Sequence, residues 1–485
     1  MTIATEESAG LGHKVRRGLA FSLLNSALVR AGTLLFGIVL ARLLTPEDFG
    51  VFAVALVALN ALLSVNELGV SLALVRWPGD PQRIAPTVTT ISIGFSVLLY
   101  AGCFVAAEPF AVAMNAPEAA GVVRLLCLSV LIDGLTAVPA QLLARYFKQG
   151  RRLAVDLANL TITMGTAVAL AASGAGAWSL AWGRLVGTAV SALMLFRLAS
   201  TWPRPGFDRG QAGELLRFGM PLAGASMLVF AMVNVDYLVV GRVLGTAALG
   251  FYLLAFQLAS WPVNMFSAAA RRVSLAAFSR LQDRPRELAA ALGRSTALLA
   301  AVTLPVCALL GLLALPLVTT VYGPNWAPAA AALQYLALLG LARVLIELFY
   351  DFLVAAGRTR QTMALQGLWT ALLVPALTAG ALVGGIAGVA LAHALVALLV
   401  VIPAYAVSVL RVGVPVRVLL RPLALPALGT VLLTGAVLVV RAAIDPGLVQ
   451  LAVGCLVGFA VYLPVVAPLR KLARGSAGPA ETLDP

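Results

Sequence analysis

Long runs of apolar residues dominate the chain, and short polar stretches separate one run from the next. A helix that crosses the hydrocarbon core of a bilayer needs about 20 predominantly apolar residues. Fourteen runs meet this requirement, and no connection between them is long enough to fold as a separate domain. Because fourteen is even, both ends of the chain are predicted to lie on one side of the membrane. The predicted spans are 18–43, 50–72, 85–107, 120–142, 154–173, 177–198, 217–240, 248–268, 295–317, 328–352, 363–384, 386–409, 422–441 and 448–468.

The composition agrees with this pattern. Hydrophobic residues make up 61% of the 485 residues and charged residues 11%, whereas a soluble domain carries about 25% charge. Such a chain cannot cover its surface in water, which excludes a cytosolic enzyme, a disordered protein and a secreted disulfide scaffold. We therefore predict an all-α integral membrane protein.

The basic residues predict the orientation. Of the 34 lysines and arginines, 27 lie in the tails and in alternate connections that share one predicted side, while the other side holds only Arg42, Arg124, Arg242 and Arg441. Cytoplasmic segments are enriched in lysine and arginine, so both termini are predicted to be cytoplasmic, in a bacterial inner membrane. This asymmetry also explains the net charge of +14, and we expect no nucleic-acid partner.

The sequence repeats itself at an offset of 200 residues. The segment 39–44, followed by Gly50-Val-Phe52, matches the segment 239–244, followed by Gly250-Phe-Tyr252. The repeat unit is six helices, so both copies insert in the same orientation, and a pseudo-two-fold axis runs along the membrane normal through a central cleft. The predicted parts are an N-terminal tail (1–17), an N-lobe (18–200), a cytoplasmic linker (201–216), a C-lobe (217–410), two appended helices (411–468) and a C-terminal tail (469–485).

Two acidic residues lie in the first predicted outer connection. Glu47 and Asp48 admit a catalytic role in glycosyl transfer, but a local role is favoured. Thr45 is predicted to cap the following helix, Pro46 suits its first position, and acids in the first turn complement the helix dipole.

Six patches in order along the chain resemble one transporter family. They are Leu40-Ala-Arg-Leu-Leu-Thr-Pro-Glu-Asp-Phe-Gly50, Phe218-Gly-Met-Pro-Leu222, Asp236-Tyr-Leu-Val-Val-Gly-Arg-Val-Leu-Gly245, Leu249-Gly-Phe-Tyr252, Phe278-Ser-Arg-Leu-Gln-Asp283 and Tyr322-Gly-Pro-Asn-Trp326. The set resembles the polysaccharide transporter (Wzx-type) flippases of the multidrug/oligosaccharidyl-lipid/polysaccharide exporter superfamily.

The resemblance implies a two-lobed flippase fold like that of the multidrug exporters (MATE) of the superfamily, here with fourteen helices because two are appended. It also implies that an undecaprenyl-pyrophosphate-linked oligosaccharide repeat unit is turned from the cytoplasmic to the outer leaflet, for exopolysaccharide or lipopolysaccharide synthesis. A polysaccharide polymerase and glycosyltransferases are expected partners. The two lobes would alternate access around a cationic central cavity.

Three arginines lie inside predicted spans and are candidates for contact with the pyrophosphate or with an acidic sugar. Arginine grips phosphate in a bidentate manner, and it is costly in mid-membrane without a partner or a purpose. Arg30 shares a polar stripe of its helix with Asn25. Arg343 is followed one turn later by Glu347, so a local ion pair is a strong alternative. For Arg184, snorkelling to the outer interface is as well supported as ligand contact.

Three acids inside spans are candidates either for ion coupling or for pairing with a buried arginine, and pairing is favoured. They are Asp133, Asp236 and Glu347. No nucleotide-binding loop, HExxH motif or paired-cysteine site occurs in the sequence, so we expect no cofactor, no metal and no catalytic residues.

Two other functions stay open. A drug exporter of the same superfamily, coupled to a cation, usually has twelve helices, which the appended pair argues against. A membrane polymerase or glycosyltransferase acting on lipid-linked sugars needs a sizeable outer loop, and the predicted outer connections are short.

Overall fold

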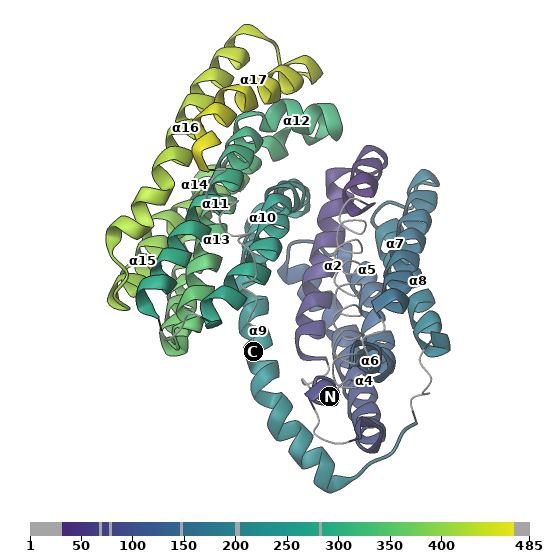
Figure 1. The fold of residues 1–485 in the computed structure, drawn as a ribbon. Coiled ribbons are helices and arrows are strands. Elements are labelled where there is room, and N and C mark those ends of the chain that lie inside the picture. The colour runs from purple at the N-terminus through teal and green to yellow at the C-terminus, as the bar shows by residue number, and fades with distance from the viewer. Residues whose placement is uncertain are drawn as a thin grey trace. The chain divides into compact units, whose positions relative to one another are not determined.

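The computed structural model describes residues 32–66, 70–76, 80–145, 149–198, 204–280 and 284–469. Within these ranges every regular element is a helix (Figure 1). Twelve helices are long and apolar enough to cross a membrane. One of the twelve, Thr359–Arg411, has 53 residues, which is enough for two crossings, and the apolar helix Gly32–Leu43 is the described part of the first predicted span. With these two features the structure confirms the fourteen-helix architecture.

A chain reversal divides the double-length segment. Helix α14 (Thr359–Val396) contains non-helical backbone at Gly384 and Gly385, and Gly385 has a φ of +56°. The two halves then lie against each other, because a Cβ added at Gly380 would come within 2.4 Å of the Gly388 carbonyl oxygen. Only glycines permit this approach of two backbones. A π-helical turn (Ala397–Val401) and α15 (Ile402–Arg411) complete the second half.

The chain divides into two compact units, residues 1–250 and 251–485. After Gly32–Leu43, the elements of unit 1 are α2 (Pro46–Val65), α3 (Ala73–Arg76), a 3₁₀ turn (Pro81–Arg83), α4 (Ala85–Ala113), α5 (Ala119–Cys127), α6 (Ser129–Arg145), α7 (Gln149–Ala172), α8 (Ala177–Leu198) and α9 (Arg209–Leu244). Helix α10 (Thr246–Arg280) begins in unit 1. One apolar core of this unit joins α3, α4, α6 and α9, with Leu74, Val88, Leu142 and Leu215 at 4% exposure or less. The lobe boundaries proposed from the repeat stay a prediction.

The first turn of α2 confirms the predicted cap. Thr45 accepts a hydrogen bond from the backbone N–H of Asp48, and the Asp48 carboxylate accepts one from the backbone N–H of Thr45. The other oxygen of Asp48 accepts a hydrogen bond of 3.0 Å from the backbone N–H of Ala177, the first residue of α8. Asp48 therefore caps two helices, which supports the local role of this acid.

The two glycines related by the 200-residue offset contact each other's helix within unit 1. A Cβ added at Gly50 on α2 would lie 1.9 Å from the Thr246 carbonyl oxygen at the start of α10, and a Cβ added at Gly250 would lie 1.9 Å from the Pro46 carbonyl oxygen at the start of α2. Residues 46 and 246 have the same offset of 200. The contact is thus reciprocal, as expected for two equivalent segments that pack around a pseudo-two-fold axis.

Unit 2 continues with α11 (Pro285–Leu312), α12 (Ala314–Val321), a 3₁₀ turn (Pro324–Trp326), α13 (Ala327–Ala355), α14, the π-helical turn, α15, α16 (Val416–Ala443), α17 (Leu448–Val466) and a final 3₁₀ turn (Ala467–Leu469). The appended helices α16 and α17 pack on α11 through a core of Leu309, Leu313, Leu433, Val437 and Tyr462. Gly454 and Gly458, four residues apart on α17, allow this packing, because a Cβ added at Gly454 would come within 2.9 Å of Leu313, which follows α11, and one added at Gly458 within 2.9 Å of Leu309 of α11.

Candidate functional site

Arg343 lies on α13, a helix whose other residues are mostly apolar. Most of its central residues are buried leucines, alanines and valines, whereas Arg343, Glu347 and Tyr350 are half-buried. These three residues are spaced by four and three positions and therefore share one helix face. That face is the part of α13 that offers polar groups to a ligand.

The close packing of α10 on α13 sets the surroundings of Arg343. A Cβ added at Gly340 would meet the Ala259 carbonyl oxygen at 3.3 Å, so the two helices cross where a side chain is absent. This crossing brings Ser260 and Phe256 of α10 within reach of the guanidinium. Arg343 Nη1 donates a hydrogen bond of 3.4 Å to Ser260 Oγ, and its Cζ lies 5.8 Å from the centre of the Phe256 ring.

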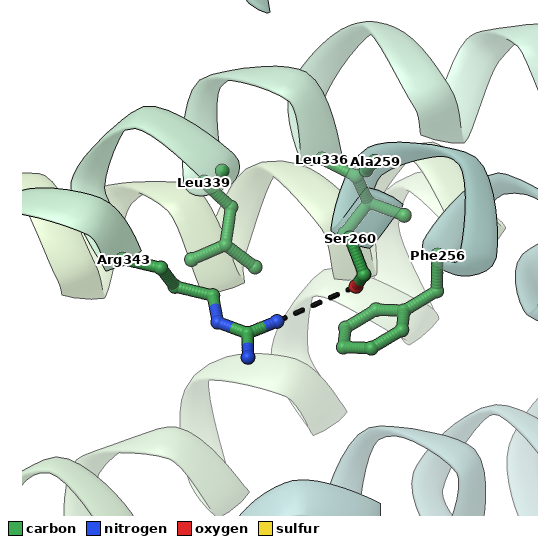
Figure 2. Close-up of a pocket in the computed structure, with 7 residues that line it drawn as sticks. Phe256, Ala259, Ser260, Leu336, Leu339 and Arg343 are labelled. Atoms are coloured by element: carbon green, nitrogen blue, oxygen red, sulfur yellow. Dashed lines mark hydrogen bonds between the residues drawn. The ribbon is translucent and has the colours of Figure 1, made fainter. Parts of the chain in front are cut away.

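Figure 2 shows these groups at the wall of a small recess in unit 2. The recess is too narrow to hold a water molecule, and it is lined by Phe256, Ala259, Ser260, Leu336, Leu339, Gly340 and Arg343. Its walls are apolar apart from the Ser260 hydroxyl and the guanidinium. In the described part of the chain Arg343 makes no ion pair with Glu347, so most of its N–H donors stay available to an anion.

Buried polar groups with unused hydrogen-bonding capacity lie on α14 and α15 of unit 2. His393 of α14 is buried, and its ring packs edge-on against Trp369 with centroids 6.4 Å apart. His393 Nδ1, Trp369 Nε1, Tyr405 Oη and Gln366 Oε1 are buried without a hydrogen-bond partner among the described residues. Buried polar atoms normally find partners, so this part of unit 2 is suited to water or to hydroxyl groups.

The structure places the other predicted candidates as follows. Asn25 and Arg30 lie outside the described residues. Arg184 is half-buried on α8, and its guanidinium has no hydrogen bond or ion pair within the described ranges. Asp236 is buried on α9 at 1% exposure, and its carboxylate accepts a hydrogen bond from the backbone N–H of Tyr237. Asp133 on α6 is bonded to Asn66.

Sequence reasoning missed Ser260 and Phe256, which contact Arg343, and also Trp369 and Tyr405, which carry buried polar atoms. Ser260 and Phe256 come from a different helix, and Trp369 and Tyr405 are indistinguishable in sequence from ordinary core aromatics of apolar helices. The contacts of Arg343 with Ser260 and Phe256 depend on how α10 packs on α13. The one signal available was His393, which the repeat aligns with Arg184.

Comparison with known families decides the relationship of this chain. Residues 39–331 match the family model described as "Polysaccharide biosynthesis protein". The chain belongs to this family. Two relatives extend the similarity. The succinoglycan biosynthesis transport protein ExoT of Rhizobium meliloti (strain 1021) is 28% identical over 382 residues, which cover 78% of this chain and 76% of ExoT. The lipopolysaccharide biosynthesis protein WzxC of Escherichia coli (strain K12) is 25% identical over 383 residues, covering 76% of each chain.

Solved structures show the fold of this polysaccharide biosynthesis protein. The lipid II flippase MurJ in an inward closed conformation has a TM-score of 0.78 and 15% identity, covering 94% of this chain and all of that one. An inward-facing MATE-family multidrug transporter of the MOP superfamily has a TM-score of 0.61 and 18% identity, covering 80% of this chain and 98% of its own. The protein is therefore an all-α, multi-pass membrane protein with the two-lobed MATE-like flippase fold and two appended helices.

Proposed function

We propose that this protein is a flippase that carries an undecaprenyl-pyrophosphate-linked oligosaccharide repeat unit from the cytoplasmic to the outer leaflet of a bacterial inner membrane. It would act by exposing a cationic cavity alternately to the two sides. A polysaccharide polymerase and glycosyltransferases would act on the same glycan before or after it. Both termini would lie in the cytoplasm.

The family membership over residues 39–331 is the observation that carries this proposal. The names of ExoT and WzxC link relatives to the transport or synthesis of surface polysaccharides. The neighbouring folds support a transporter, and MurJ covers 94% of this chain, whereas the MATE transporter covers 80%. The drug-exporter alternative therefore has less support than the flippase.

Arg343 supplies the chemistry in unit 2. A glycan on a pyrophosphate cannot cross the hydrocarbon core unaided, because each desolvated polar group costs several kcal/mol. A planar guanidinium donates two parallel hydrogen bonds to a phosphate, and Ser260 and Phe256 hold it beside the recess. We propose the same ligand for Arg30, Asn25 and Arg184. Asp236 and Glu347 stay proposals for ion coupling or for pairing.

The test is a flipping assay in proteoliposomes. A fluorescent undecaprenyl-pyrophosphate oligosaccharide is reconstituted with purified protein, and a membrane-impermeant quencher reports the fraction that changes leaflet. Wild type should accelerate exchange, Arg343→Ala should abolish it, and Arg343→Lys should recover part of it, since an ammonium lacks the bidentate fork. Arg284→Ala is the matched control, because Arg284 is 69% exposed and pairs only with Glu287 within the described residues. The same series applied to Arg30 tests the first span.

Exchange no faster than in protein-free vesicles would refute the flippase. Drug resistance lost on deletion of the gene, with normal surface polysaccharide, would favour the exporter instead. Loss of chain elongation, with lipid-linked repeat units still delivered to the outer leaflet, would favour a polymerase.

The orientation has its own test. Reporter fusions after residues 45, 110, 245 and 325 should be active in the periplasm, and fusions after residues 80, 150, 208 and 285 in the cytoplasm. Two or more reversals would contradict the predicted topology.

A further inference from the structure

Unit 1 holds a carboxyl group in surroundings that do not match a structural ion pair. Asp133 is half-buried in the apolar span Ala119–Leu143. Its Oδ2 accepts a hydrogen bond of 2.9 Å from the Asn66 side-chain amide, its single side-chain partner among the described residues. An ionised carboxylate at mid-membrane costs at least about 2.5 kcal/mol, and a neutral amide brings no compensating charge. The apolar surroundings therefore favour the neutral, protonated form of Asp133, while the N–H that Asn66 donates favours the ionised form and opposes them.

The amide that meets Asp133 is fixed in orientation. Asn66 is fully buried, and its Nδ2 also donates to the Val130 carbonyl oxygen at 3.3 Å. Its Oδ1 accepts a hydrogen bond of 2.7 Å from the Ser96 hydroxyl. Two acceptors on one side require that the NH₂ group, and not the oxygen, faces Asp133. Hard metal cations take oxygen ligands, so an N–H donor at this position favours a proton over a metal ion.

Backbone packing brings the three helices together at this point. A Cβ added at Gly134, next to Asp133, would lie 2.0 Å from Ser96 Oγ. The absence of that side chain lets Ser96 of α4 approach α6 and hold the Asn66 amide. The group formed by Asn66, Ser96 and Asp133 is thus built from α2, α4 and α6.

A seam of buried hydroxyls leads from the start of α4 to this group. Thr89, Ser92 and Ser96 are three and four residues apart, share one helix face, and are 2%, 0% and 1% exposed. Thr89 Oγ1 and Ser92 Oγ have no hydrogen-bond partner in the described ranges. Hydroxyls both donate and accept, and buried water typically satisfies such groups. Water between such hydroxyls would complete a path for a proton.

The helices packed against α6 carry few groups that compete for the proton. Glu47 and Asp48 stand at the opposite end of α2 from Asn66. The titratable or charged side chains nearer the middle of the other helices include Tyr100 on α4, Cys127 on α5, Asp156 on α7 and Arg184 on α8. Asp133 makes no hydrogen bond or ion pair with any of them.

We propose that Asp133 is a proton-binding site, loaded from the end of α4 that begins at Ala85 through the hydroxyls of Thr89, Ser92 and Ser96. A proton from water forms an O–H bond with Oδ1, the oxygen that Asn66 leaves unbonded, and neutralises the carboxylate; release returns it to water. The claim that this proton is exchanged during the transport cycle rests on the proposed function, whereas the existence of the binding site does not.

Infrared difference spectroscopy on the full-length protein in lipid nanodiscs tests the site without any glycan. Lowering the pH should produce the carbonyl band of a protonated carboxyl group. Asp133→Asn should remove that band, and Asp133→Glu should produce a carboxyl band again. Asn66→Leu should shift the Asp133 band, because the hydrogen bond to Oδ2 is lost. Glu118→Gln, which removes an exposed acid beyond the helix ends, is the control and should leave it unchanged.

The rate of band formation after a pH jump tests the path. Thr89→Val keeps the shape of the side chain and should slow protonation, whereas Thr161→Val, on an exposed face of α7, should not. A band that persists in Asp133→Asn, or that is absent from wild type, would overturn the proposal. If the Asp133→Asn protein does not fold, the shift of the band in Asn66→Leu is the deciding measurement.

The two proposals fail differently. If wild type shows the Asp133 band but does not flip the fluorescent lipid, the function is refuted and the proton site stands. If wild type flips the lipid at a rate that ignores an imposed pH gradient, the coupling role is refuted and the flippase stands.

Discussion

Replacing Gly50 by alanine tests the reciprocal helix contact in unit 1. The new Cβ would lie 1.9 Å from the Thr246 carbonyl oxygen and 2.5 Å from its carbon. Both are backbone atoms, so no side-chain rotation relieves the overlap, and the start of α10 must move by more than 1 Å, a rough estimate from carbon contact distances of about 3.5 Å.

Gly94 provides the matched control. It is exposed on α4, and a Cβ added there meets nothing within 4 Å. Both substitutions gain the same helix propensity, up to about 1 kcal/mol, so the difference between the two variants isolates the overlap. Inserting atoms into a packed site costs about 1–3 kcal/mol. A backbone partner places Gly50→Ala at the upper end of that range.

The assay is the thermal midpoint of the purified protein in detergent, followed by the fraction that stays monodisperse on size exclusion. In a domain of 150–250 residues, 1 kcal/mol moves the midpoint by about 2–4 °C. Gly50→Ala should therefore melt several degrees below Gly94→Ala. Gly250→Ala should behave like Gly50→Ala, and the double variant should lose less than the sum, because both changes separate the same pair of backbones.

Equal midpoints for Gly50→Ala and Gly94→Ala would refute the contact as described. Strictly additive losses in the double variant would show that the two glycines belong to separate contacts and not to one symmetric crossing.

Three further predictions concern helix ends and a turn. Asp48→Ala should destabilise the protein by about 1–2 kcal/mol, because a lost cap costs that much and Asp48 also caps α8 through Ala177; a loss no greater than that of Glu47→Ala in the same thermal assay would contradict the double cap. Gly385→Ala should cost about 1–3 kcal/mol, because a φ of +56° combined with a ψ of −143° is a backbone conformation that essentially only glycine adopts; an unchanged midpoint would contradict this turn. Burial raises the pKa of Tyr322, which lies outside the spans, to about 12. A tyrosine in the unfolded chain ionises near pH 10, so its contribution to stability is complete below pH 10 and is lost as pH rises toward 12. Absorbance titration of wild type against Tyr322→Phe should show one tyrosine ionising near pH 12, and its ionisation near pH 10 would contradict the burial.

Local patterns were enough to establish the membrane-spanning architecture. Span length follows from bilayer thickness, so runs of apolar residues identified the crossings, including the two that α14 joins through Gly384 and Gly385. The cap at Thr45 also depends only on residues within one turn. The repeat pointed to Gly50 and Gly250 as equivalent positions, although it did not show that they contact each other.

Partners across helices were decided by the tertiary structure alone. The i,i+4 spacing pointed to Glu347 as an alternative partner of Arg343, but it did not reveal the hydrogen bond to Ser260, which forms because the α10–α13 crossing at Gly340 brings that hydroxyl close. For Asp133 the sequence left ion coupling and pairing with an arginine open, and it did not reveal the hydrogen bond from Asn66. Helices that are apolar all round carry little information about which face meets which neighbour. The close approaches that settle the matter occur at glycines, which have no side chain to mark the contact in the sequence.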